Sequence, residues 1–388
     1  MVPLTGHLLL WLLAAAALGV PILMLRYGGG GHRRDRGRRV ALVLVGQLAA
    51  VAVTAAAAND YGDFYPTWTD LFGSVHVAAD TPVQTFGATK SATTTTRRIV
   101  RSGRAISAAD ARSVVAGMRP LSFSRPEEYA DRGAVVRLPG ADPSQEVLAY
   151  LPPSYFTGAP ANAALPVLEL LTGYPGTPDT IVGKLNAPDD LLAGLHSGTL
   201  HPMVLLMTRP VAPFPRDTEC SDVPNGPQNL DYLATTLPQA AASQLHIDIT
   251  SMAVAGYSTG GYCALKLAMT KPGVFVGAGS MSGYYHPLPG SNSGDLFGGD
   301  PHNKDLADLD WRLRNLPAPR TAVMVATAKD ERFDDGYDAA EQFLNLVRPP
   351  MSAEALVLPR GGHNFSTWTA ELPRILAFLD ERLNRGLI

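Results

Sequence analysis

The sequence is short of charge and of cysteine. Only 17% of its 388 residues are charged, and the formal net charge is −3, so it lacks the basic excess with which proteins bind nucleic acid. It has no HExxH motif and no Cys/His cluster at metal-ligand spacing, so neither a metal nor a cofactor is implied. No stretch repeats with a solenoid period. What remains is one large domain with appendages, since 46% of the residues are hydrophobic and can fill a sizeable core.

The basic residues near the N-terminus separate two apolar runs. Segment 26–39 holds six arginines, and the uncharged runs Leu8–Leu25 and Val40–Ala58 flank it. Each run is close to the roughly 20 residues that a helix needs to cross a bilayer, and Pro21 is tolerated in such a helix. Because short basic loops stay in the cytoplasm, residues 1–60 are predicted to form a transmembrane hairpin. The chain after Ala58 would then lie outside the plasma membrane of a multi-pass protein.

A secretory signal is the alternative to this hairpin. The opening "MVPLTGH" has no positive n-region, which argues against a signal at the extreme N-terminus. A later signal stays open, with the arginines as n-region and "TAAAAND" as the cleavage site. The hairpin is favoured, and it makes bilayer lipid a predicted partner.

From about Leu121 the chain alternates between apolar runs and helical patterns. Several runs are apolar throughout, as strands buried on both faces are, and the alternation predicts an α/β domain with a mostly parallel, doubly wound sheet over 121–388. Residues 61–120 are predicted to be an extracytoplasmic linker with a weak amphipathic helix at 107–118. The predicted strands are "GAVVRLPG", "QEVLAYLPPSY", "LPVLELLTG", "HPMVLLMTRP", "ITSMAVAGYS", "GVFVGAGSMSG", "RTAVMVATA" and "AEALVLPRGG", and the predicted helices are 179–184, 229–244, 260–270, 305–313, 335–347 and 367–387.

Ser258 is the candidate nucleophile. It lies in the G-x-S-x-G sequence from Gly256 to Gly260, after the strand "SMAVAGY" and before the helix "GGYCALKLAMTK". In that context the motif predicts a sharp turn that exposes the serine hydroxyl above the sheet. The other interpretation is a turn of small residues that serves packing alone.

A serine hydroxyl needs a base, and in this topology the chain order is serine, acid, histidine. His286, His302 and His363 follow Ser258. His363 is favoured, because it follows the strand "EALVLPRGG" at the sheet edge where catalytic groups of open α/β sheets gather.

The triad acid is expected at the end of the strand before His363. The segment "TAVMVATAKDERFDD" offers Asp330, Glu331, Asp334 and Asp335. The first two lie nearest the strand end. Asp330 is preferred, with Glu331 as the alternative, since a carboxylate there would fix the imidazole tautomer and stabilise the imidazolium.

The oxyanion hole is predicted to use two backbone N–H groups. One is that of Thr259, which directly follows the nucleophile, and the other is that of Tyr174, in the loop after the strand "LPVLELLTG". The alternative for Gly173 and Gly176 is an ordinary turn beside Pro175.

Four segments together resemble the serine esterases of the esterase D type: "YLPPSY", "LELLTGYPG", "AVAGYSTGGYCALKLAMTKPGVFVGAGSMSGYY" and "GGHNFSTW". That family includes S-formylglutathione hydrolases, feruloyl esterases and the secreted mycolyltransferases of the mycobacterial cell wall. The resemblance runs from about Ala134 to Arg385. It implies an α/β-hydrolase fold and a triad of Ser258, Asp330 or Glu331, and His363. The subfamily's substrate does not carry over, because no signature of trehalose or of very long acyl chains is present.

The segment "RDTECSDVPNGPQNLDYLATTLPQ" is similar to an acidic, cysteine-containing loop of exported actinobacterial members of that family. The resemblance implies a disulfide between Cys220 and Cys263, whereas two buried free thiols are the alternative. Asp217, Glu219 and Asp222 would then line the pocket, or else be solvated loop acids.

The predicted function is that of a membrane-anchored, extracytoplasmic serine esterase or acyltransferase. Its substrate would be an acyl-ester small molecule or a glycolipid, attacked through an acyl-enzyme intermediate. Two alternatives stay open: a catalytically inactive binding module that has kept the fold, and a serine peptidase on the same fold.

Overall fold

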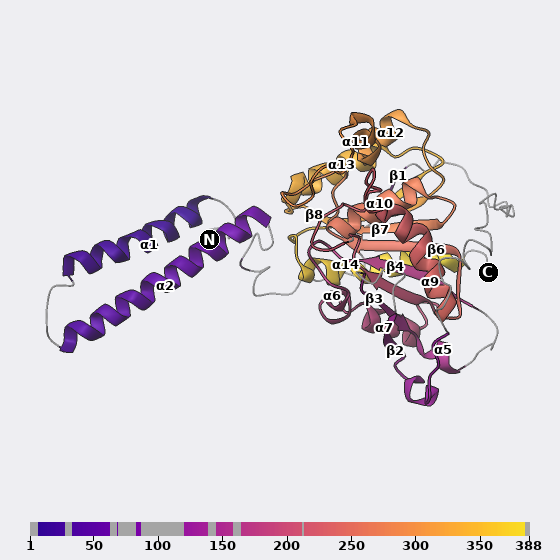
Figure 1. Cartoon of the computed structure of the whole chain (residues 1–388), viewed down its shortest axis with the longest axis horizontal. Coiled ribbons are helices and arrows are strands. Elements are labelled where there is room, and N and C mark those ends of the chain that lie inside the picture. Colours follow the sequence, from indigo (N-terminus) through magenta and orange to yellow (C-terminus); the bar gives the residue numbers. More distant parts are fainter. Residues whose placement is uncertain are drawn as a thin grey trace.

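The computed structural model describes residues 7–27, 33–62, 68, 83–86, 120–138, 145–157, 164–211 and 213–384. Two parts are visible in Figure 1: a pair of long N-terminal helices and an α/β domain. Helix α1 (His7–Tyr27) and helix α2 (Arg33–Gly62) lie side by side. A Cβ on Gly46 of α2 would lie 3.2 Å from the side chain of Val20 on α1, so glycine allows the close approach of the two helices.

The basic segment differs from its prediction. Residues 26–39 were expected to be a loop, but α2 begins at Arg33, so most of the arginines belong to the helix. Arginine has a good helix propensity, and this lets the helix extend beyond the apolar run. Within the described residues, one helix is long and apolar enough to span a membrane, Val40–Asn59. A second apolar stretch, Leu9–Val20, is shorter.

The α/β domain is built on a nine-stranded mixed sheet in the order β1-β9-β8-β7-β6-β4-β5-β3-β2. The six strands from β5 to β9 in this order are mutually parallel, whereas β3 runs antiparallel to β5, β2 to β3 and β1 to β9. All eight strands predicted after Leu121 form. The strands are β1 (Val83–Phe86), β2 (Ala134–Leu138), β3 (Val147–Leu151), β4 (Leu165–Leu171), β5 (Val204–Thr208), β6 (Ile247–Tyr257), β7 (Phe275–Met281), β8 (Ala322–Ala328) and β9 (Ser352–Leu358).

Strand β1 comes from the segment that was predicted to be a linker. It is only four residues long and pairs with the edge of β9, with Val83 opposite Leu356 and Phe86 opposite Ala353. Because the two strands are antiparallel, the chain joins the sheet at the carboxyl end of β9. Most of the rest of 61–120, including the helix expected at 107–118, lies outside the described residues.

Helices cover both faces of the sheet. Alternate residues of β4 belong to two separate cores, Val167 and Leu171 to one and Leu168 and Leu170 to the other, as the period of two in a strand requires. The first core is closed by α9 (Leu237–Gln244), α10 (Thr259–Thr270), α12 (Leu309–Asn315) and α13 (Gly336–Leu346), and the second by α6 (Pro178–Gly183), α7 (Ala187–Ser197) and α14 (Phe365–Asn384).

The remaining helices are short. The helix expected at 229–244 is divided into α8 (Asn229–Asp231), a π-helical turn η2 (Tyr232–Thr236) and α9, and the one expected at 305–313 into α11 (Pro301–Ala307) and α12. Asp308 ends α11 and caps α12, because its side chain accepts a hydrogen bond from the Trp311 N–H at 2.7 Å. The others are η1 (Pro126–Tyr129), α5 (Pro153–Thr157) and η3 (Phe333–Asp335).

Candidate active site

Ser258 occupies the sharp turn between β6 and α10. Its φ and ψ of 56° and −126° lie in a region that costs a non-glycine residue roughly 1–3 kcal/mol. Three backbone hydrogen bonds hold this conformation. The Ser258 N–H donates to the Met281 carbonyl at 3.0 Å, and the Ser258 carbonyl accepts from the N–H groups of Gly261 at 2.8 Å and Tyr262 at 3.1 Å. The turn therefore fixes the hydroxyl at the carboxyl edge of the sheet.

The two glycines of the motif are required by the packing of this turn. A Cβ on Gly260 would lie 2.3 Å from the Leu171 carbonyl oxygen, and one on Gly256 would lie 2.5 Å from the Gly260 backbone. Both obstacles are main-chain atoms, which a change of side-chain rotamer cannot remove. Strand β6 and helix α10 can therefore meet this closely only where side chains are absent.

Ser258, His363 and Glu331 form a continuous hydrogen-bonded chain. The Ser258 hydroxyl lies 2.8 Å from His363 Nε2, and His363 Nδ1 lies 2.9 Å from Glu331 Oε1. An ionised carboxylate only accepts, so this contact assigns the proton to Nδ1 and leaves Nε2 free to accept from the serine. All three residues are buried, with exposed fractions of 8%, 3% and 1%.

Two hydroxyl groups bind the other oxygen of Glu331. The Ser282 hydroxyl donates to Oε2 at 2.8 Å and that of Thr327 at 3.4 Å. Ser282 follows β7 and Thr327 lies near the end of β8. These two bonds hold the buried carboxylate with Oε1 directed toward the imidazole.

The preferred assignment of Asp330 as the acid beside the histidine is corrected by this geometry. Asp330 Oδ1 accepts from the Gly361 N–H at 2.7 Å, so the side chain faces the loop between β9 and α14. The chain turns directly after β8, with the Glu331 N–H donating to the Ala328 carbonyl, and successive side chains in that turn point in different directions. Glu331, the alternative acid, is the one that reaches the imidazole.

The other candidate histidines and acids lie away from the serine. His286 Nε2 is 3.4 Å from Asp334 Oδ1, and this contact raises the pKa of His286. His302 lies at the start of α11, where its ring faces that of Trp311. Asp335 occupies a left-handed conformation before α13. Within the part of the chain that the structure describes, none of these side chains forms a hydrogen bond with Ser258 or His363.

Two aromatic side chains that sequence reasoning missed enclose the His363 ring. The ring centroid of Phe333 lies 4.2 Å from that of His363, and Trp368 meets it edge-on at 5.2 Å. Trp368 also stacks on Tyr257, the residue before the nucleophile, at 4.5 Å. These contacts restrict the orientation of the imidazole. Trp368 lies in the quoted "GGHNFSTW" segment, but no sequence pattern indicated that its ring faces the histidine.

The two predicted oxyanion donors lie beside the nucleophile. Thr259 is the first residue of α10, where the backbone N–H has no carbonyl acceptor within the helix. The chain leaving β4 passes Ser258 so closely that a Cβ on Gly173 would lie 3.0 Å from the Ser258 Cβ. Tyr174 comes next, and its hydroxyl donates to the Pro215 carbonyl at 2.6 Å, with its ring against Phe214. Both N–H groups thus belong to backbone segments next to the serine.

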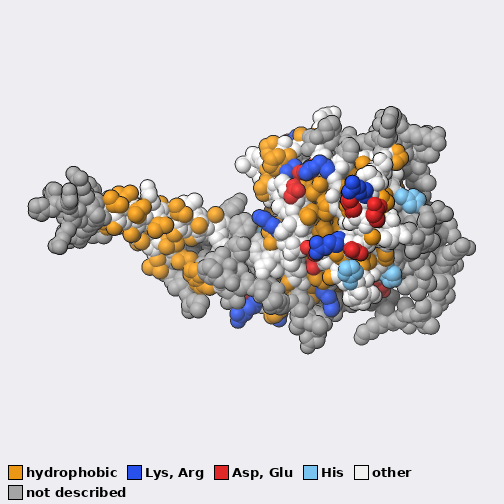
Figure 2. All heavy atoms as spheres, turned by 90° about the horizontal axis from the view of Figure 1, so that it is seen from below, with side chains coloured by type: hydrophobic (Ala, Val, Ile, Leu, Met, Phe, Trp, Pro, Cys, Tyr) orange, Lys and Arg blue, Asp and Glu red, His pale blue; other side chains and the backbone are white. Residues whose placement is uncertain are grey.

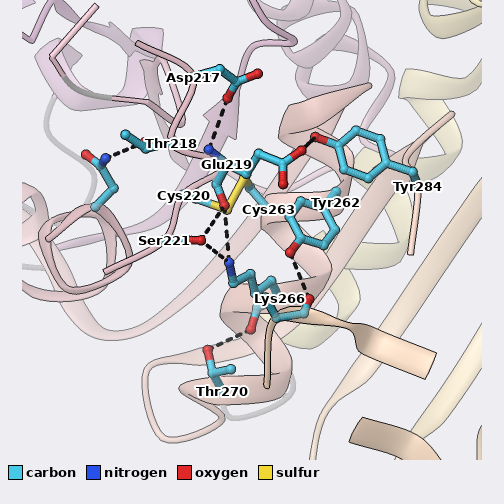
Figure 3. Close-up of a disulfide and its surroundings, with 12 residues drawn as sticks. Asp217, Thr218, Glu219, Cys220, Ser221, Tyr262, Cys263, Lys266, Thr270 and Tyr284 are labelled. Carbon is cyan, nitrogen blue, oxygen red and sulfur yellow. Dashed lines mark hydrogen bonds between the residues drawn. A yellow bond between two sulfur atoms is a disulfide. The ribbon is translucent and has the colours of Figure 1, made fainter. Parts of the chain in front are cut away.

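Cys220 and Cys263 form a disulfide that joins the acidic loop to α10 (Figure 3). Within this loop, Asp217 and Glu219 are buried, whereas Asp222 is exposed. The carboxylate of Glu219 accepts hydrogen bonds from Tyr284 and from the Leu288 N–H. Glu219 is therefore not a solvated loop acid, because the protein encloses its carboxylate.

Comparison with known proteins supplies a family and a fold. Residues 142–379 match the family model described as "Putative esterase". No curated protein matches the chain in a sequence search. Among solved structures, a ferulic acid esterase is similar with a TM-score of 0.54 at 18% identity, covering 65% of this chain and 98% of its own.

Two further solved structures have the same fold. An S-formylglutathione hydrolase from Agrobacterium tumefaciens has a TM-score of 0.54 at 16% identity, covering 69% of this chain and 100% of its own. FphF from Staphylococcus aureus, a fluorophosphonate-binding serine hydrolase, has a TM-score of 0.50 at 18% identity, covering 64% and 98%. At these identities the likeness shows the α/β-hydrolase fold alone.

Proposed function

This chain belongs to the esterase family whose model it matches, and we propose that it is a membrane-anchored, extracytoplasmic enzyme that forms an acyl-enzyme on Ser258. The family makes the chain a carboxylic-ester hydrolase or acyltransferase of the esterase D type, which acts on small-molecule esters. The observation that carries the proposed mechanism is the chain of contacts from Ser258 through His363 to Glu331.

In the proposed reaction, the Ser258 oxygen attacks the ester carbonyl carbon while its proton moves to His363 Nε2. The carboxylate of Glu331 stabilises the imidazolium, and the N–H groups of Thr259 and Tyr174 bind the oxygen that gains negative charge. The carbon–oxygen bond to the leaving alcohol then breaks, and His363 gives its proton to that alcohol. Water or a second alcohol then attacks the acyl carbon and loses its proton to His363. The bond from that carbon to the Ser258 oxygen breaks, His363 returns the proton to Ser258, and the acid or the new ester leaves.

The N-terminal helices support the proposed anchor. Figure 2 shows hydrophobic side chains along the surface of this helix pair. Trp11, Leu48 and Val51 of these helices are 73%, 69% and 66% exposed. Apolar surface of that extent is stable in lipid rather than in water. The basic residues between the apolar runs favour a cytoplasmic position, which would place the α/β domain outside.

The position of β1 supports a substrate at the membrane surface. Val83, where the chain joins the sheet, lies toward the carboxyl end of β9, and β9 continues at that end into the loop that carries His363. Four strand spacings of about 4.8 Å separate β1 from β6, so this point lies about 19 Å across the sheet from the strand that precedes Ser258. The segment 63–82 reaches at most about 70 Å. We therefore propose an acyl lipid or glycolipid of that membrane as one source of substrate.

A fluorophosphonate probe tests the nucleophile directly. The full-length protein should be labelled and should cleave short-chain aryl esters, and Ser258→Ala should lose both properties while keeping its melting temperature. Wild-type protein that folds yet neither labels nor cleaves such esters would instead be an inactive binding module. Labelling with peptide cleavage and no ester cleavage would indicate a peptidase.

The topology is tested separately. A reporter fused after residue 60 should be active outside the membrane and remain in the membrane fraction with residues 1–60. Recovery of a shorter, soluble reporter would show that this segment is a cleaved signal instead.

A further inference from the structure

The loop that carries the disulfide is held in an unusual conformation. Glu219 and Cys220 both have a φ of 46°, in the left-handed region that non-glycine residues seldom adopt. Asp217 Oδ1 accepts from the Glu219 N–H at 3.0 Å, and the buried Lys266 ammonium donates to the Glu219 carbonyl at 3.2 Å. Figure 3 shows these bonds around the disulfide. Such strain persists only where the surroundings enforce it, and it concentrates at functional sites.

The conformation of the loop directs the Glu219 carboxylate into the protein. The side chain is fully buried, and two neighbours donate to it: the Leu288 N–H, at 2.8 Å from Oε1 and 3.0 Å from Oε2, and the Tyr284 hydroxyl, at 3.0 Å from Oε1. Burial, followed by the charge of Asp217, raises the pKa of Glu219 to about 7. The carboxylate therefore binds the segment that follows β7.

Tyr284 extends this contact to the first turn of α10. Its ring stacks on Tyr262 of α10 with centroids 4.7 Å apart. Burial holds the pKa of the Tyr284 phenol well above its ordinary value, so the hydroxyl stays protonated and donates to Glu219. Tyr262 lies in the first turn of α10, and its N–H donates to the Ser258 carbonyl at 3.1 Å. The contacts thus run from Glu219 through the Tyr284 ring to the turn that carries the nucleophile.

We propose that Glu219 is a positioning residue for the oxyanion hole, acting through the Tyr284 hydroxyl to hold the first turn of α10, and with it the Thr259 N–H, against the reacting carbonyl. This inference rests on the proposed function of Ser258. The disulfide from Cys220 to Cys263 fixes the distance between the loop and the helix that the network joins. The loop then serves catalysis without touching the substrate.

Replacing Glu219 by glutamine tests the proposal. In the glutamine variant the NH₂ group opposes the Leu288 N–H in either orientation of the amide, because that N–H lies 2.8 Å from Oε1 and 3.0 Å from Oε2. The side chain therefore has to move, and the Tyr284 hydroxyl loses its fixed partner. A misplacement of a catalytic group by 1 Å costs up to about 100-fold in rate, so we expect kcat to fall by about tenfold for a partial shift. KM should stay within about twofold, because the donor acts on the transition state.

The matched control is Asp222→Asn in the same loop, an exposed carboxylate whose Oδ1 accepts from the Asp231 N–H at 3.0 Å, a bond that the amide oxygen can keep. Its kcat should equal that of the wild type. Tyr284→Phe removes one hydroxyl and keeps the ring stack, and it decides the question if Glu219→Gln fails to fold. It should reproduce the fall in kcat.

A double-mutant cycle separates positioning from general destabilisation. Tyr284→Phe removes the hydroxyl that donates to Glu219, so it should lower kcat about as much as Glu219→Gln, and the double variant should lose no more than either. Independent losses that multiply would overturn the proposal, as would an unchanged kcat in Glu219→Gln. If the wild type itself is not labelled at Ser258, the proposed function fails first.

The pH profile gives a second readout. Groups on three elements face the carboxylate: Asp217 in its own loop, Lys266 and Tyr262 on α10, and Tyr284 after β7. Burial lowers the pKa of Lys266 to about 8. As the pH falls through 7, Glu219 gains a proton and loses acceptor capacity, so kcat of the wild type should decrease with a steeper acid limb than that of Glu219→Gln. Identical limbs in the two proteins contradict the inference.

Discussion

Exchange of the Glu331 carboxylate for an amide tests the assignment of the triad acid. Glu331→Gln keeps the length and shape of the side chain and removes its charge. The amide oxygen can take the place of Oε1 and still accept a hydrogen bond from His363 Nδ1. The imidazolium that forms during attack by Ser258 then lacks its counter-ion. We expect kcat for a short-chain aryl ester to fall steeply while the protein remains folded.

The size of that loss follows from the geometry. A hydrogen bond of 2.9 Å between Nδ1 and Oε1 places the two charges roughly 4 Å apart, and their attraction is about 4 kcal/mol at an effective dielectric constant of 20. Since each 1.36 kcal/mol is tenfold in rate, the expected loss is about 1,000-fold. It approaches 10,000-fold if the amide turns its NH₂ group toward the imidazole and forces the wrong tautomer, as an Asp→Asn exchange does in serine proteases.

Asp330→Asn is the matched control at the adjacent position. Its amide oxygen can still accept from the Gly361 N–H, which is 2.7 Å from the carboxylate in the wild type, so kcat should change by no more than a few-fold. Initial rates at saturating ester, with melting temperatures recorded for both variants, make the comparison. A loss in Asp330→Asn as large as that in Glu331→Gln would refute the assignment.

Further predictions concern stability and substrate access. Gly260→Ala should destabilise the fold by several kcal/mol in thermal melts, because the added Cβ would lie 2.3 Å from the Leu171 carbonyl oxygen. Replacement of both Cys220 and Cys263 by Ala, which opens a loop of 43 residues, should lower the free energy of unfolding by up to about 4 kcal/mol. Burial holds the pKa of Glu169 well above 4.5. The unfolded chain therefore loses this proton at a lower pH than the native one, so Glu169 should lower the stability by up to about 1.4 kcal/mol per pH unit above 4.5, and in urea titrations the slope of Glu169→Gln should be smaller by that contribution. Full-length protein in vesicles should cleave an acyl-ester lipid in its own bilayer faster than one in separate vesicles, and equal rates would argue against a membrane-facing site.

The elbow was predictable because its constraints are local. Gly256, Ser258 and Gly260 appear in the sequence at the spacing that a strand-to-helix turn requires, and main-chain atoms lie where a Cβ on either glycine would be. His363 could be favoured because it follows a predicted strand at the edge that Ser258 shares. The aromatic contacts of Phe333 and Trp368 with His363 depend on tertiary packing, and no local pattern indicates them.

The choice between Asp330 and Glu331 could not be made from the sequence. Adjacent residues in a turn have no fixed period that assigns their side chains to a face. In the structure, partners that are distant in the sequence orient the two side chains. The Ser282 hydroxyl donates to Oε2 of Glu331, and the Gly361 N–H donates to Asp330. Both partners come from segments that only the folded sheet brings near the end of β8.

Strand β1 was missed for a related reason. Its four residues, Val83–Phe86, lie in a polar segment and have no periodic signal, so their extended form depends on pairing with the edge of β9. Such an edge strand is stabilised by its neighbour rather than by its own propensities. Helix α7 (Ala187–Ser197) was also missed, although its Leu191 is fully buried against the second core.

In the acidic loop, Glu219 is buried, although its neighbours in the sequence predict a solvated carboxylate. In the sequence, Glu219 stands between charged and polar neighbours, where a carboxylate is usually solvated. The disulfide at Cys220 and the left-handed backbone at both residues turn this side chain away from water. A buried carboxylate is costly unless donors satisfy it, and the donors here are Tyr284 and Leu288, close to the elbow. The cost of burying Glu219 is thus offset by bonds that also order the turn beside Ser258, and loss of the charge should affect rate before it affects the fold.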